Sequence, residues 1–314
     1  MQLPAGRGAD RFGSQSVAVL AIVAALAGNA LLLTGGGFEL ALAGRAIVGI
    51  GSGAAFVAGL DLVRAGGGGA ALQGAYGGAT MAGGGLALMI VPPLTDATSW
   101  RAPYWTAAAL ALAAAIPTIA AKGLPGLGHA GEWVLRDRAL VPIGALQAAT
   151  FGLAVVAGNW AVPLLERQGA NSTAAGLAGG LILFVGIVTR PAGGLLAGSV
   201  SGRRLVGAAL VGTSAGALLL ALGGPFALST LGSLLLGLMA GLPFAVIFAA
   251  AQRARPDAPG AAIALVNACA VLTILVGAPL AGLAFELPGD GRVAFAVIAT
   301  LAAAALVPLR KARV

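Results

Sequence analysis

Apolar residues fall in long unbroken blocks along the chain, separated by short polar or charged segments. A helix needs about 20 such residues to cross the hydrocarbon core of a bilayer. The period-two alternation typical of a membrane β-barrel is absent. The pattern predicts an all-α polytopic membrane protein with about ten transmembrane helices, over residues 16–34, 38–63, 70–95, 103–122, 139–164, 173–197, 203–222, 226–250, 259–284 and 292–309.

The composition supports a membrane protein. Hydrophobic residues make up 59% of the chain and charged residues only 9%, whereas soluble domains carry about 25% charged residues. Most of the 51 glycines lie inside the apolar blocks, where small residues let helix backbones approach closely in lipid. The single cysteine, Cys269, excludes an internal disulfide and fits a small packing residue.

The basic charge is distributed unevenly between the two sides of the predicted membrane. If the N-terminus is cytoplasmic, the inner loops hold thirteen Lys and Arg residues and the outer loops three, Arg101, Arg167 and Arg292. This positive-inside bias predicts a protein of the cell membrane with both termini in the cytoplasm. The net charge of +8 therefore needs no nucleic-acid partner. Residues 1–27 fit a cleaved signal peptide only loosely, and the charge count works with the first helix retained.

Three sets of residues recur at a nearly constant offset, which predicts an internal duplication. The matched positions are Pro4-Ala5-Gly6 with 191–193, Gly44, Gly49, Gly53 and Phe56 with 232, 237, 241 and 244, and Gly74, Pro93 and Leu94 with 260, 279 and 280. The second half then contains six helices and the first half four. The chain reads as helices three to twelve of a twelve-helix protein whose first two helices are absent.

The longest polar segment separates the two halves and sets the expected domains. We expect an incomplete N-terminal helical bundle over 1–122, a cytoplasmic central loop over 123–138, and a C-terminal six-helix bundle over 139–314. The loop contains the only histidine, His129. A lone histidine without further ligands at metal-binding spacing is most simply a solvated side chain, so neither a metal nor another cofactor is expected.

One motif near the N-terminus resembles a signature of the major facilitator superfamily of secondary transporters. That family carries G-x-L-A-D-R-x-G-R-R in the loop between its second and third helices. The matching residues here are Gly6, Ala9, Asp10, Arg11 and Gly13. The sequence departs from the motif at Gly8, where Leu is usual, and at 14–15, where Ser-Gln replaces the basic pair.

Two further motifs extend the resemblance over the whole chain. Arg45 with Gly49, Gly51 and Gly53 is similar to the family's R-x-x-x-G-x-G-x-G on its fourth helix, and the glycine run 74–85 with Pro92-Pro93 is similar to its fifth-helix motif. The resemblance implies a two-bundle fold, here with 4 + 6 helices, and secondary active transport of a small solute or ion by a monomer in the lipid bilayer. It implies gating roles for the motif residues Gly6, Asp10, Arg11, Gly13, Gly49 and Gly53.

Two arginines, Arg45 and Arg190, lie well inside predicted spans, where a charge costs at least about 2.5–3.5 kcal/mol and must face the bundle or a cavity. Arg45 either reaches the outer surface along its stem or is a cavity-facing cation. Arg190 precedes Pro191, which favours a kink. A guanidinium fixed there grips an anion with paired donors, or else forms a salt bridge in a gate or contacts helix-end carbonyls.

The segment around Arg190 also resembles one branch of the family. Thr189–Gly194, TRPAGG, is similar to the arginine-bearing segment of nitrate/nitrite transporters. That branch is expected to use a second, symmetry-related arginine, whereas the duplication places Leu3 there, with Gln2 beside it. Transport of nitrate, nitrite or another small anion is therefore an alternative within the transporter class.

Other polar and aromatic residues in the spans are candidates for the substrate site. Helix-to-helix hydrogen bonding or packing is the alternative role for each of them. They are Tyr76, Gln147, Asn159, Trp160, Phe244 and Asn267. No carboxylate lies deep in a span, so the coupling ion cannot be read from the sequence.

Two other classes of function compete with transport. A membrane-embedded enzyme would need a nucleophile, base or metal set within the spans, and one loop histidine and one isolated cysteine supply none. A non-transporting remnant or a mis-started reading frame is the second alternative, because two helices that normally line the pathway are missing.

Overall fold

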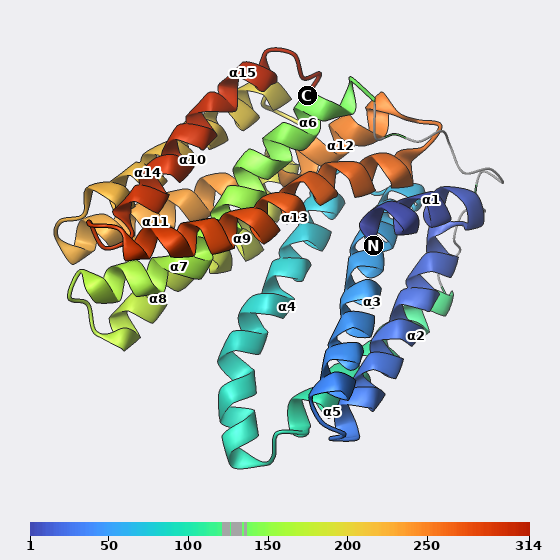
Figure 1. The fold of residues 1–314 in the computed structure, drawn as a ribbon. Helices are drawn as coiled ribbons and strands as arrows, with labels where there is room; N and C mark the ends of the chain where they lie inside the picture. The colour runs from blue at the N-terminus through green and yellow to red at the C-terminus, as the bar shows by residue number, and fades with distance from the viewer. Residues whose placement is uncertain (121–125, 127–133, 135–136) are drawn as a thin grey trace. The chain divides into compact units, whose positions relative to one another are not determined.

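The computed structural model describes residues 1–120, 126, 134 and 137–314, and these are helical almost throughout (Figure 1). Each predicted block coincides with one helix or with two or three helical segments in direct succession. The elements are α1 Gln2–Phe12, α2 Ser14–Leu33, α3 Phe38–Ala65, α4 Ala70–Ala97, α5 Ala102–Ala120, α6 Leu140–Gln147, η2 Ala148–Gly152, α7 Leu153–Arg167, α8 Ser172–Phe184, α9 Gly186–Leu196, α10 Gly202–Leu222, α11 Phe226–Gly241, α12 Phe244–Ala254, α13 Pro259–Leu283, η3 Ala284–Glu286, α14 Arg292–Ala304 and α15 Leu306–Leu309. No strand occurs in the described ranges, which confirms the all-α prediction.

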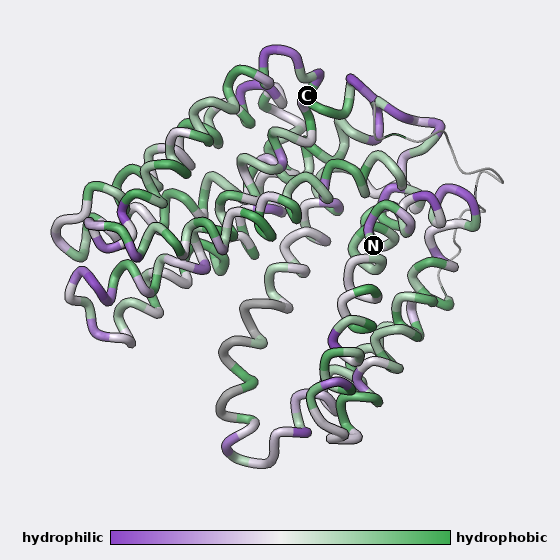
Figure 2. Tube along the Cα trace, viewed as in Figure 1, coloured by the Kyte–Doolittle hydropathy of each residue, from purple (hydrophilic) through white to green (hydrophobic). Residues whose placement is uncertain are grey.

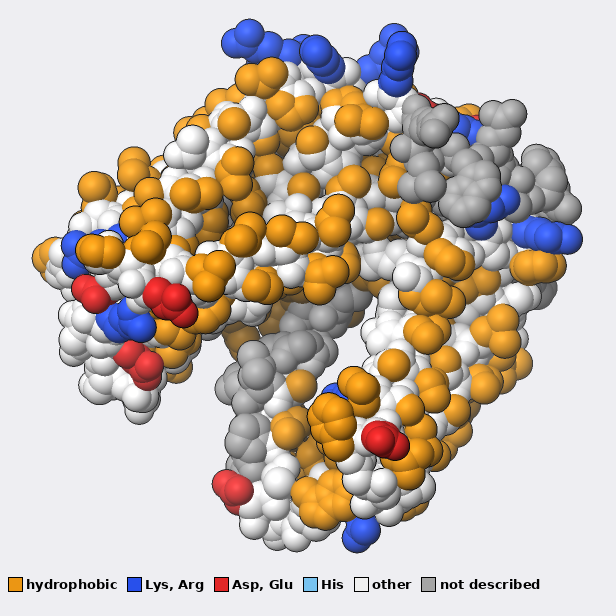
Figure 3. All heavy atoms as spheres, in the orientation of Figure 1, with side chains coloured by type: hydrophobic (Ala, Val, Ile, Leu, Met, Phe, Trp, Pro, Cys, Tyr) orange, Lys and Arg blue, Asp and Glu red, His pale blue; other side chains and the backbone are white. Residues whose placement is uncertain are grey.

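The length and surface of the helices fit a bilayer. Within the described part of the chain, nine helical segments of 18 to 29 residues are apolar enough to cross a membrane, and the tenth predicted block is the 28-residue helix α4. Apolar residues run along the helices while hydrophilic ones gather at their ends (Figure 2). Large apolar side chains cover much of the visible surface (Figure 3), an arrangement that suits lipid tails rather than water. The chain is a polytopic α-helical membrane protein.

The first motif, expected in a loop, lies mainly in the helix α1. Only Gly13 leaves helical geometry, with a φ of 88° that glycine adopts without steric cost. α1 packs against both α2 and α3. The motif residues Gly6, Asp10 and Arg11 are therefore held on a short helix, because tertiary packing outweighs the low helix propensity of its glycines.

The chain divides into two compact units. The first comprises 1–68, 83–134 and 255–264, and the second comprises 69–82, 135–254 and 265–314. The helices α4 and α13 each contribute residues to both units. His129 and most of the expected central loop lie outside the described residues, and the domain boundaries at 122 and 139 stay a prediction.

Glycines allow the helices of the first unit to pack backbone to backbone. A side chain at Gly28 would stand 2.7 Å from the carbonyl oxygen of Gly44 on α3, and one at Gly51 would stand 2.7 Å from the carbonyl oxygen of Ala21 on α2. Such close contact is how helices associate where the solvent is as apolar as the side chains. The backbones of α2 and α3 are therefore in direct contact.

Helices of the second unit are interrupted more often. The π-helix η2 separates α6 from α7, Val185 separates α8 from α9, and Ala305 separates α14 from α15. Pro191 lies inside α9, where it leaves the carbonyl of Ile187 without its helical hydrogen bond. Interruptions of this kind free backbone groups inside a bundle, and π-bulges are frequent at functional sites.

The packing between α2 and α3 can be tested with two glycines of one motif. In Gly51→Ala the new methyl meets backbone 2.7 Å away, whereas Gly49 has no atom within 4 Å of the equivalent position. We expect Gly51→Ala to lower the stability of the purified protein by about 1–3 kcal/mol, measured by thermal unfolding in detergent. Gly49→Ala should be neutral or slightly stabilising. Equal stability of the two variants would contradict the close packing.

Candidate functional site

Arg190 lies in the interior of the second unit, on α9. The residue is only 2% exposed, and it follows the break at Val185 and precedes Pro191. Glycines bring α4 against this part of the helix. A side chain at Gly74 would meet the carbonyl oxygen of Arg190, and one at Gly78 would stand 2.6 Å from the carbonyl oxygen of Ile187. The guanidinium is therefore positioned by two backbones in direct contact.

The guanidinium has two polar partners and two aromatic ones. Its Nη1 donates to the carbonyl oxygen of Gly77 at 2.9 Å and to Oγ1 of Thr80 at 3.2 Å. The ring centroids of Phe244 and Phe151 lie 4.3 and 4.7 Å from its central carbon. A desolvated cation–π contact is worth about 2 kcal/mol or more, so the two rings stabilise the charge in a place from which water is excluded.

No carboxylate pairs with Arg190 within the described part of the chain, where the ion pairs join Arg64 to Asp61 and Arg255 to Asp257. All its hydrogen bonds to described residues come from Nη1, which leaves the donors Nε and Nη2 for another acceptor. A cavity of about 10 Å³ adjoins the residue, enough for about one water molecule. A buried cation that has no carboxylate partner among the described residues, and that has donors left over, can bind an anion.

Buried polar groups without partners lie elsewhere inside the second unit. Gln147 and Asn267 are 1% and 3% exposed. The amide nitrogen of Gln147, the amide oxygen of Asn267 and the hydroxyl of Thr189 have no hydrogen-bond partner among the described residues. Leaving such a group unsatisfied costs about 1–3 kcal/mol, so these atoms are suited to water or a solute. The roles of Gln147 and Asn267 in binding stay predictions.

The aromatic candidates Phe244 and Tyr76 differ in their surroundings. Phe244 is 2% exposed and packs against Phe248, with ring centroids 4.8 Å apart. A side chain at Gly77 would collide with the Phe244 ring, so the glycine makes room for the aromatic contact with Arg190. Tyr76 is half-buried on the same stretch of α4.

Three other candidates occupy the periphery. Arg45 is exposed on α3, where its Nη2 donates to the hydroxyl of Tyr104 at 3.4 Å. Asn159 is exposed on α7. The indole N–H of Trp160 donates to the carbonyl oxygen of Ala278 at 2.8 Å and its ring packs on Phe285. The structure does not gather these residues with Arg190, and their binding roles stay predictions.

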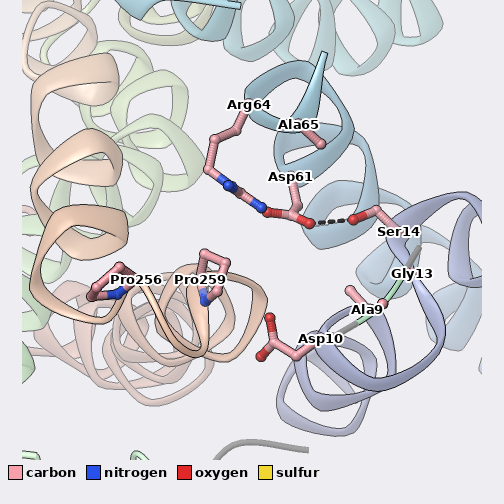
Figure 4. A pocket seen from close by; sticks show the side chains of 10 residues that line it. Ala9, Asp10, Gly13, Ser14, Asp61, Arg64, Ala65, Pro256 and Pro259 are labelled. Atoms are coloured by element: carbon pink, nitrogen blue, oxygen red, sulfur yellow. Dashed lines mark hydrogen bonds and ion pairs between the residues drawn. The ribbon is translucent and has the colours of Figure 1, made fainter. Parts of the chain in front are cut away.

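Ala9, Asp10 and Gly13 of the first motif help to line a cavity of about 140 Å³ in the first unit (Figure 4). Asp10, 3% exposed, accepts the backbone N–H of Gly260 at 2.8 Å and of Ala261 at 2.9 Å. These donors belong to the first turn of α13, where the partial positive charge of the helix favours an anion. Burial raises the pKa of the Asp10 carboxyl, and the two backbone hydrogen bonds partly oppose that rise.

A second carboxylate lines the same cavity. Asp61 pairs with Nε of Arg64 at 2.7 Å and accepts the hydroxyl of Ser14. The i,i+3 spacing of Asp61 and Arg64 was readable from the sequence, whereas the contact with Ser14 depends on how α2 meets α3.

The remaining motif residues do not line this cavity. Gly6 faces Gly260, whose carbonyl oxygen leaves no room for a side chain there. Arg11 is exposed and lies over the Phe12 ring at 5.0 Å. Gly49 faces open space, and Gly53 has Gln2 3.7 Å from a would-be side chain. Gating by these residues stays a prediction.

Comparison with known proteins identifies the fold. No protein-family model matches the sequence, and no protein of curated function matches it. Solved structures of major facilitator superfamily transporters do match, so the chain has the fold of that superfamily and the resemblance read from the motifs is confirmed at this level.

Three of these structures illustrate the likeness. A variant of the E. coli fucose:proton symporter FucP is 16% identical, with a TM-score of 0.77, over 99% of this chain and 86% of FucP. The human organic anion transporter MFSD10 (TETRAN) is 17% identical, with a TM-score of 0.81, over 98% of this chain and 80% of that one. FucP in the outward conformation, a major facilitator superfamily transporter, is 14% identical, with a TM-score of 0.79, over 99% and 86%.

The contact between Asp10 and α13 can be tested by hydrogen exchange. Each N–H donates to a different oxygen of Asp10. In Asp10→Asn one of these oxygens becomes an NH2 donor and the charge is lost, and a hydrogen bond to a charged group is worth about 1.5–3 kcal/mol. We expect the amides of 260–264 to exchange roughly tenfold faster or more, measured by mass spectrometry. Asp257→Asn, which removes an exposed carboxylate next to the same helix, is the control. Unchanged exchange in Asp10→Asn would contradict the capping role.

Proposed function

We propose that the protein is a secondary active transporter that moves a small solute across the membrane by alternating access. The fold supports this proposal, because the solved structures it resembles are transporters. Interrupted helices around a buried polar interior also support it, since broken helices in transporters commonly carry the binding site. The thirteen-to-three distribution of basic residues supports a cell-membrane protein with cytoplasmic termini.

We further propose that the solute is a small anion bound at Arg190. The observation that carries this step is a buried guanidinium with no carboxylate partner among the described residues and with two free donor groups. Nε and Nη2 form one edge of the planar guanidinium, which suits the two oxygens of a carboxylate or of nitrate. One similar structure is that of an organic anion transporter, which supports an anionic substrate.

The aromatic rings and the break in the helix each have a role in this proposal. The rings of Phe151 and Phe244 hold the guanidinium plane and exclude water, so an incoming anion meets a fixed cation in a medium of low dielectric constant. The cavity beside Arg190 is large enough for about one water molecule, so binding of a larger solute requires movement of the surrounding helices. The interruption at Val185 gives α9 a point at which to move.

Uptake into proteoliposomes tests the role of Arg190. In Arg190→Lys the charge remains but the paired donors are lost, so we expect uptake of the transported anion to fall at least about tenfold, the cost of one charge-assisted hydrogen bond. Arg45→Lys is the matched control, because Arg45 is exposed and hydrogen-bonds Tyr104. Radiolabelled nitrate, nitrite and small carboxylates form the substrate panel.

The outcomes separate the two parts of the proposal. Uptake of a neutral solute that is equal in wild type and Arg190→Lys, at equal abundance in the vesicles, would contradict anion binding and leave transport standing. Absence of uptake for every solute class, including sugars, would contradict transport by this chain.

A further inference from the structure

An apolar groove of about 330 Å³ lies within the second unit, away from Arg190. Ala145, Ala148 and Ala149 line it from α6 and η2, and Ala304 and Pro308 line it from the end of α14 and from α15. α6 contacts α15, and η2 contacts α14.

The local sequence explains why the groove exists. The π-helix displaces the backbone between α6 and α7, and α14 ends at Ala304 before α15 begins. The residues that face the gap are mostly alanines, whose single methyl cannot fill it. The groove is open at the surface, where Leu301 and Ala304 are exposed. Left unfilled it would forfeit dispersion contacts on both sides, so an apolar occupant is favoured.

The lining restricts the chemistry of that occupant. The one polar side chain in it is Thr273, whose hydroxyl already donates to the carbonyl oxygen of Cys269 at 2.9 Å. No side chain in the groove therefore offers a free donor to a polar solute. A methylene occupies about as much volume as a water molecule, so the groove takes roughly ten methylene groups. A hydrocarbon chain of that length is the kind of molecule that fits.

One end of the groove is positively charged. Arg138 lies two residues before α6, and the N–H of Val141 donates to the carbonyl oxygen of Asp137 at 3.3 Å. The helical turn therefore begins before Arg138 and places it two turns ahead of Ala145. Lys311 lies two residues after α15, and the N–H of Ala312 donates to the carbonyl oxygen of Pro308 at 3.0 Å. The helical turn therefore continues through Lys311, three residues after Pro308. Both are exposed, and Lys and Arg side chains gather over α15 and beside the start of α6 (Figure 3). The neighbouring carboxylate, Asp137, accepts the backbone N–H of Ala139 at 2.8 Å.

We propose that this groove binds one anionic glycerophospholipid, with an acyl chain against the alanines and the phosphate between Arg138 and Lys311. The combination of an apolar slot and a cationic rim at the end of the same helices is what a lipid with a charged headgroup requires. A zwitterionic lipid would fill the slot but would gain less from the rim.

Native mass spectrometry of the detergent-purified protein tests this site. The protein is mixed with phosphatidylglycerol or with phosphatidylcholine of the same acyl chains. We expect wild type to retain one phosphatidylglycerol, with an affinity roughly tenfold above that for phosphatidylcholine. Ala304→Leu, which fills the slot, should abolish retention of both lipids, and the double variant Arg138→Gln/Lys311→Gln should remove the preference for phosphatidylglycerol.

Matched controls distinguish the site from general effects. Ala303→Leu makes the same change at an exposed neighbour outside the groove, and Arg253→Gln removes an exposed charge at the end of α12. Both should behave as wild type, and lipid-free thermal unfolding shows whether each variant is folded. Equal retention of the two lipids by wild type, or undiminished retention in a folded Ala304→Leu, would overturn the proposal.

Discussion

The buried guanidinium of Arg190 is the constraint around which the second unit is built. A cation at this depth is costly to insert, and within the described residues no carboxylate compensates it. The protein stabilises the charge with a backbone carbonyl, a hydroxyl and two aromatic faces. These partners satisfy one edge of the group only. The other edge, formed by Nε and Nη2, has no partner among the described residues. An anion with two oxygens can therefore bind there.

Glycines allow the helices that form this site to pack closely together in lipid. Gly74 and Gly78 let α4 touch the backbone of α9, and Gly77 leaves space for the ring of Phe244. The same device holds Gly6 against Gly260 near the capped end of α13. Packing by small residues thus links the composition of the chain to the placement of its two charged clusters, Arg190 in one unit and Asp10 with Asp61 in the other.

Much of the fold was readable from the sequence, and less of the site. Helix positions follow from block length alone, and Arg190 stands out because charges inside spans are rare. Phe151 could not be found, because the π-helix changes which face of the helix it occupies. Arg45 lies inside a span as a functional charge would, but its side chain is exposed on α3 and donates to the hydroxyl of Tyr104. This contact depends on the packing of helices far apart in sequence. The helical state of α1 was missed for the same reason.

The central claim is that Arg190 is an unopposed cation that takes an anion. Isothermal titration of the purified protein at low ionic strength, with nitrate and with a series of small carboxylates, measures this directly. The account predicts saturable binding of one anion per chain, lost in Arg190→Gln and kept in Arg45→Gln. Binding that persists unchanged in a folded Arg190→Gln variant would contradict it.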